Sequence, residues 1–275
     1  MLKAPDSFYE GTYKNRTSFL PKFDNLMFNW PLWVINSGWL WVIKNHVPKR
    51  GILLELGCAG GVDFLGNRYQ TIGCDLSFSS LQNISCYKYK VQMDASKCIT
   101  LKSESVDAIV SSYFWEHIDP NTKPAILAEC FRVLKPNGKI IFLYDVVTKN
   151  PLISWFRSKN PSMYLTQFID GDGHIGYENI RDNIFKFERA GFKIIKNSGL
   201  ERTPVQSPSI YQKLQYFSID SDKSAFRYLA FFGKSPYFYP YSLFLRLIDT
   251  IIGPLLPISW SRIHLIAAQK IPKIK

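Results

Sequence analysis

A short apolar run that ends on a cluster of glycines is the feature that most constrains how this chain can fold. Residues 52–56 read Ile-Leu-Leu-Glu-Leu, and the next five residues are Gly57-Cys58-Ala59-Gly60-Gly61. An apolar run of this length that glycines terminate is typical of a buried strand entering a tight turn. Because glycine has no Cβ, such a turn lets a ligand approach bare backbone. The sequence therefore predicts a strand, a ligand-binding loop and the start of a helix, in that order.

The same alternation of apolar runs and breaks continues along the chain. Strand and helix alternate in units that are typical of a parallel sheet with right-handed crossovers. We expect an α/β fold with a Rossmann-like, mostly parallel seven-stranded sheet and helices on both faces. Strands are expected over 52–56, 71–75, 89–94, 106–112, 139–146, 192–196 and 263–268, and helices over 78–87, 123–134 and 178–190, with a short turn near 96–101.

The chain divides into four parts by composition. We expect a helical, aromatic lead-in over 1–49, a core domain over 50–198, an inserted aromatic and basic subdomain over 199–262, and a last strand with a basic tail over 263–275. Within the lead-in, residues 25–43 carry no charge and could be a membrane span. Pro31 and Gly38 would interrupt such a helix, so amphipathic helices packed on the domain are the favoured interpretation.

Charge and cysteine content leave several classes of partner open. The formal net charge is +12 and the pI is near 9.4, which fits either an anionic partner or a merely solvated basic face. The five cysteines contain no C-x-x-C pair and indicate a reducing compartment. The first residues contain no apolar signal-peptide core. We expect a cytoplasmic protein, with peripheral contact at a membrane left open.

Glu55 narrows the class of ligand that the glycine loop is expected to bind. The G-x-G-x-x-G dinucleotide fingerprint is not met, and Glu55 stands two residues before Gly57. A carboxylate at the loop would repel a pyrophosphate but would suit a ligand with an amino group or a sulfonium.

With these features the chain resembles the class I S-adenosylmethionine-dependent methyltransferases, in the small-molecule group called type 11. Residues 55–61 resemble the first motif of the family, with Ala59 in the place of its middle glycine. Asp75 resembles the acid that holds the cofactor ribose, and Asp94-Ala95 the pair that reads its adenine. The resemblance extends over 51–195 and implies S-adenosyl-L-methionine as cofactor. The cofactor-binding residues that it implies are Glu55, Gly57, Ala59, Gly61, Asp75, Leu76, Asp94, Ala95 and Ser111.

Few catalytic side chains are obligatory for methyl transfer, although an oxygen nucleophile usually needs a base. The candidates are His174, on a glycine-rich segment that looks flexible, His117 after the fourth strand, and Tyr113; Asp145 is a further pocket-lining candidate. No cluster of acidic residues suggests a magnesium site, so no metal is expected.

The insert is expected to form the acceptor site. From Leu200 to Lys275 the sequence has ten basic and four acidic residues, a net charge of +6. Aromatic residues lie between them. This pattern fits a lid packed on the sheet or an interfacial, lipid-facing surface. The expected reaction is methylation of an O or N atom of a small molecule, glycan or lipid-linked acceptor. A nucleic-acid methyltransferase or binder, and a non-catalytic membrane-surface protein, are the alternatives; residues 111–114 lack the motif with which amino-methylating nucleic-acid enzymes grip a base.

Overall fold

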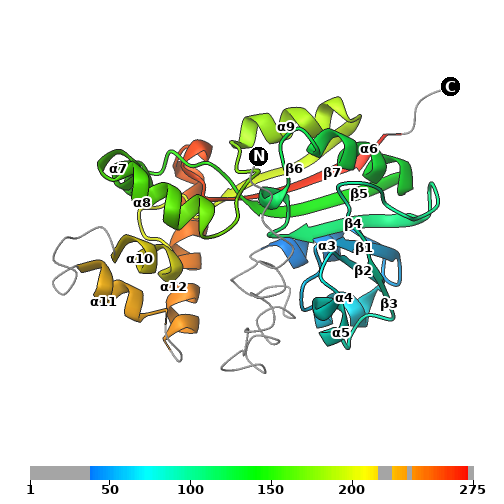
Figure 1. The fold of residues 1–275 in the computed structure, drawn as a ribbon, viewed down its shortest axis with the longest axis horizontal. Coiled ribbons are helices and arrows are strands. Elements are labelled where there is room, and N and C mark those ends of the chain that lie inside the picture. The colour runs from blue at the N-terminus through cyan, green and yellow to red at the C-terminus, as the bar shows by residue number, and fades with distance from the viewer. Residues whose placement is uncertain (1–37, 216–224, 234–236, 272–275) are drawn as a thin grey trace.

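The computed structural model describes residues 38–215, 225–233 and 237–271, and these contain one seven-stranded sheet in the order β3-β2-β1-β4-β5-β7-β6 (Figure 1). Strand β7 is antiparallel to both of its neighbours, and the other pairs are parallel. The predicted fold class is confirmed. The strands are β1 (Ile52–Leu56), β2 (Gln70–Asp75), β3 (Tyr89–Gln92), β4 (Val106–Ser112), β5 (Leu134–Asp145), β6 (Phe192–Leu200) and β7 (Ile263–Lys270).

Helices lie between these strands in the order that the sequence predicts. The predicted helix over 78–87 is shorter in the structure, because the chain becomes extended at Ile84. The helices of the core are α3 (Trp39–His46), α4 (Asp63–Arg68), α5 (Phe78–Asn83), η1 (Trp115–His117), α6 (Lys123–Val133), α7 (Pro151–Lys159), α8 (Pro161–Tyr164), η2 (Leu165–Asp170) and α9 (Ile180–Arg189).

A second group of helices comes between β6 and β7 in the sequence. They are α10 (Pro208–Leu214), α11 (Ala225–Phe231), α12 (Phe238–Ile251), η5 (Gly253–Leu255) and η6 (Ile258–Trp260). Figure 1 shows α10 to α12 gathered with α7 and α8 beyond one end of the strands. The insert starts after Leu200, because β6 extends past its predicted end and pairs with β7 as far as Ile263.

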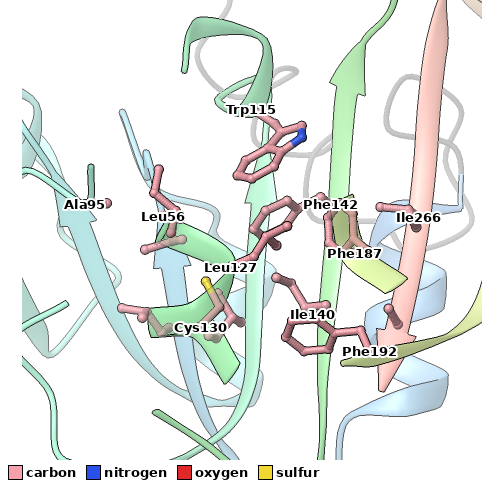
Figure 2. Packing of buried hydrophobic residues seen from close by; sticks show 14 of the residues in the cluster. Leu56, Ala95, Trp115, Leu127, Cys130, Ile140, Phe142, Phe187, Phe192 and Ile266 are labelled. Atoms are coloured by element: carbon pink, nitrogen blue, oxygen red, sulfur yellow. The ribbon is translucent and has the colours of Figure 1, made fainter. Parts of the chain in front are cut away.

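The core fills both faces of the sheet. On one face Trp115, Phe142 and Phe187 pack with α6 and α9 (Figure 2). On the other face α3 and α4 contribute Trp39 and Leu65. Strands that are buried on both faces read as continuous apolar runs, which is why the sequence reveals them well.

The chain before Gly38 lies outside the described residues, and with it most of the uncharged stretch over 25–43. The described end of that stretch is α3, which packs on the sheet, and the indole Nε1 of Trp39 donates to the carbonyl of Ile141 at 3.2 Å. None of the helices in the described part of the chain has the length and apolar character needed to cross a membrane.

Candidate functional site

The loop after β1 runs along the edge of the sheet where the parallel strands end, the edge at which open α/β sheets bind ligands. Its φ angles are positive at Gly57 (65°), Ala59 (43°) and Gly61 (73°). For Ala59 this left-handed conformation costs about 1 kcal/mol, because its Cβ crowds the following carbonyl. The backbone N–H of Ala59 donates to Oδ2 of Asp75 at 2.9 Å, which fixes the loop against the end of β2.

The three glycines of this loop serve different purposes. A Cβ on Gly57 would lie 2.6 Å from the ring of Phe114, and one on Gly61 would lie 2.8 Å from Ile84. A Cβ on Gly60 would meet no atom of the described residues within 4 Å. Gly57 and Gly61 are therefore needed for packing inside the protein, whereas the backbone at Gly60 borders open space that a ligand can enter.

Glu55 does not present a charge at the loop, contrary to the sequence-based expectation. Its side chain is 1% exposed, and the hydroxyl of Tyr87 donates to its Oε2 at 2.5 Å. Burial raises the pKa of Glu55 to about 8, against a smaller lowering by Tyr87. Tyr87 also accepts from the backbone N–H of Val62 at 2.8 Å. Glu55 thus supports the loop from inside the core, and it is mostly protonated at neutral pH.

Two carboxylates do stand at the ends of neighbouring strands. Asp75 closes β2 and accepts from the backbone N–H of Ser77 at 2.9 Å; beside it, Leu76 is 41% exposed. Asp94 follows β3. Burial raises its pKa, but hydrogen bonds from Ser96 and the charge of Lys97 outweigh that effect and lower the pKa overall.

The remaining predicted cofactor residues lie inside the protein. Ala95 is buried in the core. Ser111 is buried too, and its hydroxyl donates to the carbonyl of Leu56 at 2.9 Å, tying β4 to β1. The groups that border open space at this edge are therefore the backbone at Gly60 and the side chains of Asp75, Leu76 and Asp94.

With this geometry in place, sequence comparison identifies the domain. Residues 54–142 match the family described as "Methyltransferase domain". The chain contains a class I S-adenosylmethionine-dependent methyltransferase domain. A curated relative, the ubiquinone biosynthesis O-methyltransferase of Nitrosococcus oceani, is 26% identical over an alignment of 142 positions that covers 45% of this chain and 59% of that protein. The alignment thus spans less than two thirds of the relative.

Solved structures share the fold of the methyltransferase domain. An S-adenosylmethionine-dependent methyltransferase from Methanosarcina mazei is similar with a TM-score of 0.52 at 14% identity, over 84% of this chain and 98% of that one. The geranyl diphosphate C-methyltransferase of Streptomyces coelicolor gives a TM-score of 0.53 at 12% identity, over 84% of this chain and 79% of that one. At these identities the likeness concerns the fold alone.

The cofactor of methyltransferase domains of this class is S-adenosyl-L-methionine. The edge of the sheet fits this group in two respects. Open space borders the backbone at Gly60, and partly exposed carboxylates stand at Asp75 and Asp94 on the next two strands. Carboxylates accept hydrogen bonds from hydroxyl and amino groups, both of which this cofactor carries.

A cavity of about 300 Å³ opens at the same edge of the methyltransferase domain. Tyr113, Asp145 and Arg262 line it from the sheet, and Phe238 and Leu245 line it from α12. Arg262 is largely buried; it donates to Oδ1 of Asp145 at 3.1 Å and to Oε2 of Glu201 at 2.7 Å. The cavity wall therefore contains a cation held between two carboxylates.

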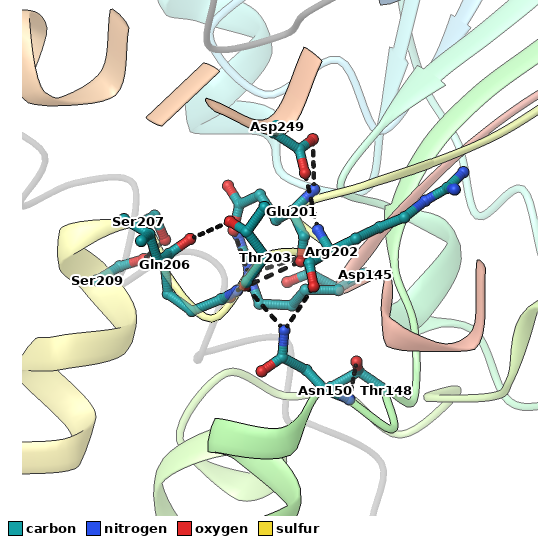
Figure 3. A network of polar contacts seen from close by, with 12 residues as sticks. Asp145, Thr148, Asn150, Glu201, Arg202, Thr203, Gln206, Ser207, Ser209 and Asp249 are labelled. Carbon is teal, nitrogen blue, oxygen red and sulfur yellow. Dashed lines mark hydrogen bonds and ion pairs between the residues drawn. The ribbon is translucent and has the colours of Figure 1, made fainter. Parts of the chain in front are cut away.

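Helix α12 is fastened to the end of β6. Asp249 accepts from the backbone N–H groups of Glu201, at 2.8 Å, and Arg202, at 2.9 Å (Figure 3). Glu201 has a φ of 53°, so these bonds hold a left-handed residue at the strand end. One side of α12 faces the cavity, and the lid remains a prediction. Its other side exposes Phe244, Leu247 and Ile251, so an apolar surface is present as well.

The structure separates the predicted catalytic residues. Tyr113 lines the cavity, is 37% exposed and has a φ of 53°. His117 and His174 pack against each other with ring centres 5.3 Å apart, and neither lines the cavity. His174 is 8% exposed, whereas the sequence suggests a flexible loop. Its Nε2 lies 3.9 Å from Oδ2 of Asp145, so the histidine pair stands behind that wall residue.

Three residues that line the cavity were not singled out from the sequence: Glu201, Asp249 and Arg262. Arg262 directly precedes the last predicted strand, and this is the one signal that could have pointed to it. Glu201 and Asp249 carry no such signal, because the strand end and the helix that bring them together are 48 residues apart.

Proposed function

We propose that the protein transfers the methyl group of S-adenosyl-L-methionine to an O or N atom, with a hydroxyl oxygen favoured, of a small molecule bound in the cavity beside Asp145. The single observation that carries this proposal is a cavity with a carboxylate at the end of β5, on the same sheet edge as the loop at Gly60. The distant likeness to an O-methyltransferase supports oxygen as the acceptor atom.

Residues of the first three strand ends would hold the cofactor. The Asp75 carboxylate would accept from the ribose hydroxyls and that of Asp94 from the adenine amine, while Leu76 offers an exposed apolar surface for the ring. The backbone at Gly60 would allow close approach. When bound, the cofactor supplies a methyl group on a positively charged sulfur.

Asp145 is suited to receive the proton of the acceptor. Its carboxylate would take the hydroxyl proton of the acceptor while the acceptor oxygen gains the methyl group that the cofactor would supply. Arg262 fixes Oδ1 of Asp145 at 3.1 Å, and the lid helix α12 limits access of water. The phenol of Tyr113 can hydrogen-bond and orient the acceptor.

The size and lining of the cavity favour a small, partly apolar acceptor. About 300 Å³ is at the lower end of ordinary small-molecule sites. Leu200, Phe238 and Leu245 supply apolar surface, and the polar groups are confined to a few positions. This supports a small molecule over a glycan chain, a lipid-linked sugar or a nucleic acid.

Product analysis with Asp145→Asn tests the proposal. S-adenosylhomocysteine release is measured with a panel of small phenols and catechols and a matched panel of aryl amines. We expect turnover on hydroxylated acceptors, a kcat lowered by about 100-fold or more in Asp145→Asn, and unchanged cofactor affinity. Asp182→Asn, on the exposed side of α9, is the matched control with wild-type kcat. Turnover of hydroxylated acceptors that survives intact in Asp145→Asn would contradict the role of Asp145, and turnover of amines alone would contradict oxygen as the acceptor atom.

A further inference from the structure

Behind the cavity wall, three metal-ligating side chains meet. Glu116 and His117 belong to η1, directly after β4, and His174 belongs to the turn after η2. One ligand atom of each lies within 4.8 Å of the other two, and within the described ranges this is the group that could hold an ion. The sequence predicts no metal, because His174 follows His117 only 57 residues later and the three residues do not form an acidic cluster.

Two atoms of this group are buried and have no hydrogen-bond partner among the described residues. They are Oε2 of Glu116 and Nδ1 of His174, on side chains that are 1% and 8% exposed. The other oxygen of Glu116 accepts from the backbone N–H of Asp145 at 3.3 Å. A buried polar atom without a partner is costly. The nearby ammonium of Lys123 is bound elsewhere, to the carbonyl of Gly176 at 2.7 Å and to Glu178.

His117 makes the hydrogen bond that metal-binding imidazoles commonly make, and His174 lies near a carboxylate. Nδ1 of His117 lies 3.0 Å from the carbonyl oxygen of Gly173, which can only accept, so this nitrogen carries the proton. Nε2 of His174 faces Oδ2 of Asp145 at 3.9 Å. Metal-binding histidines commonly donate their second ring N–H to a carbonyl or carboxylate, as His117 does, and this orients the ring.

We propose that Glu116, His117 and His174 form a binding site for a divalent transition-metal ion. Two imidazoles and one carboxylate favour Zn²⁺ or Fe²⁺ over Mg²⁺ and Ca²⁺, which prefer oxygen ligands alone. Ligands of one zinc ion lie at about 2.0–2.2 Å from it, so rotations of the three side chains by roughly an ångström at their tips bring them into range. None of the three proposed ligands lines the cavity, so the ion would lie outside it, and its binding does not depend on the proposed reaction.

Zinc titration of chelator-treated protein tests this site without any methyl acceptor. Calorimetry with ZnCl₂ should show one ion per chain, and the visible spectrum with Co²⁺ should show the d–d bands of a nitrogen and oxygen site. His174→Ala and Glu116→Gln should each weaken zinc binding about tenfold or more. His46→Ala is the matched control, because His46 lies on α3 away from this group; it should bind zinc as the wild type does.

Zinc should also raise the thermal unfolding midpoint of wild type and His46→Ala but not of His174→Ala, since an ion that binds only the folded state stabilises it. The proposed site would be wrong if the wild type did not bind one zinc ion per chain, or if His174→Ala bound zinc as tightly as the wild type. If Glu116→Gln fails to fold, X-ray absorption of the wild-type zinc complex decides. Two imidazole nitrogens with oxygen support the site, and sulfur coordination overturns it.

Discussion

The hydroxyl of Tyr87 donates a 2.5 Å hydrogen bond to the buried carboxyl group of Glu55, and the same hydroxyl accepts from the backbone N–H of Val62 at 2.8 Å. This relay connects the end of β1 to the far end of the glycine loop. The acidic residue of the loop motif therefore acts through loop geometry, not through a charge displayed to the ligand. The carboxylates that we propose to bind the cofactor are those of Asp75 and Asp94, at the ends of the next two strands.

Replacing Glu55 by Gln should change how stability depends on pH. The pKa of Glu55 is raised from 4.5 to about 8 in the folded protein, so the folded state binds the proton more tightly than the unfolded state does. Its contribution is therefore fully present below pH 4.5 and is lost as pH rises to about 8, by on the order of a few kcal/mol. Urea unfolding between pH 5 and 8.5 should show the wild type losing stability relative to Glu55→Gln. Parallel pH profiles would show that the carboxyl group is charged in the core.

Ala59→Gly should stabilise the protein. Ala59 has a φ of 43°, a conformation that glycine adopts without strain, so the substitution should raise the free energy of unfolding by about 0.5–1 kcal/mol. The matched control is Ala128→Gly, on the exposed face of α6, which should lower it by about 1 kcal/mol. Both are measured by urea denaturation. A loss of stability in Ala59→Gly would mean that the left-handed loop conformation is wrong.

Arg262→Met should destabilise the protein strongly. Arg262 lies between Asp145 and Glu201, and its removal leaves two largely buried carboxylates without their cation. Breaking a buried ion pair from one side costs about 3–5 kcal/mol. Lys135→Met removes a more exposed partner, that of Asp107, and should cost under about 1 kcal/mol. Equal effects of the two substitutions in urea denaturation would contradict the buried network.

The sheet could be predicted from the sequence because its strands are buried on both faces and read as unbroken apolar runs. The second half of β6 could not, since Asn197, Ser198 and Gly199 look like a loop. They are held as a strand by pairing with β7, where His264 lies 2.8 Å from the amide oxygen of Asn197. Local pattern carries no information about such a partner.

The candidate site was predictable where it depends on one strand end at a time, as at Asp75, Asp94 and Asp145. It was not predictable where distant segments meet. The cavity needs β6, β7 and α12 together, and the group of Glu116 and His174 needs two loops. The charge of Glu55 was misjudged because burial, which sets its pKa, cannot be read from its neighbours in sequence.

Calorimetric titration with S-adenosyl-L-methionine tests the central claim most directly. We predict one cofactor per chain, with affinity weakened about 5- to 150-fold in Asp75→Ala, the loss of about 1–3 kcal/mol expected for a charged hydrogen-bond partner. Asp182→Ala, on the exposed face of α9, should bind like the wild type. A wild-type protein that gives no binding heat at any temperature tried, or an Asp75→Ala variant with wild-type affinity, would contradict the account.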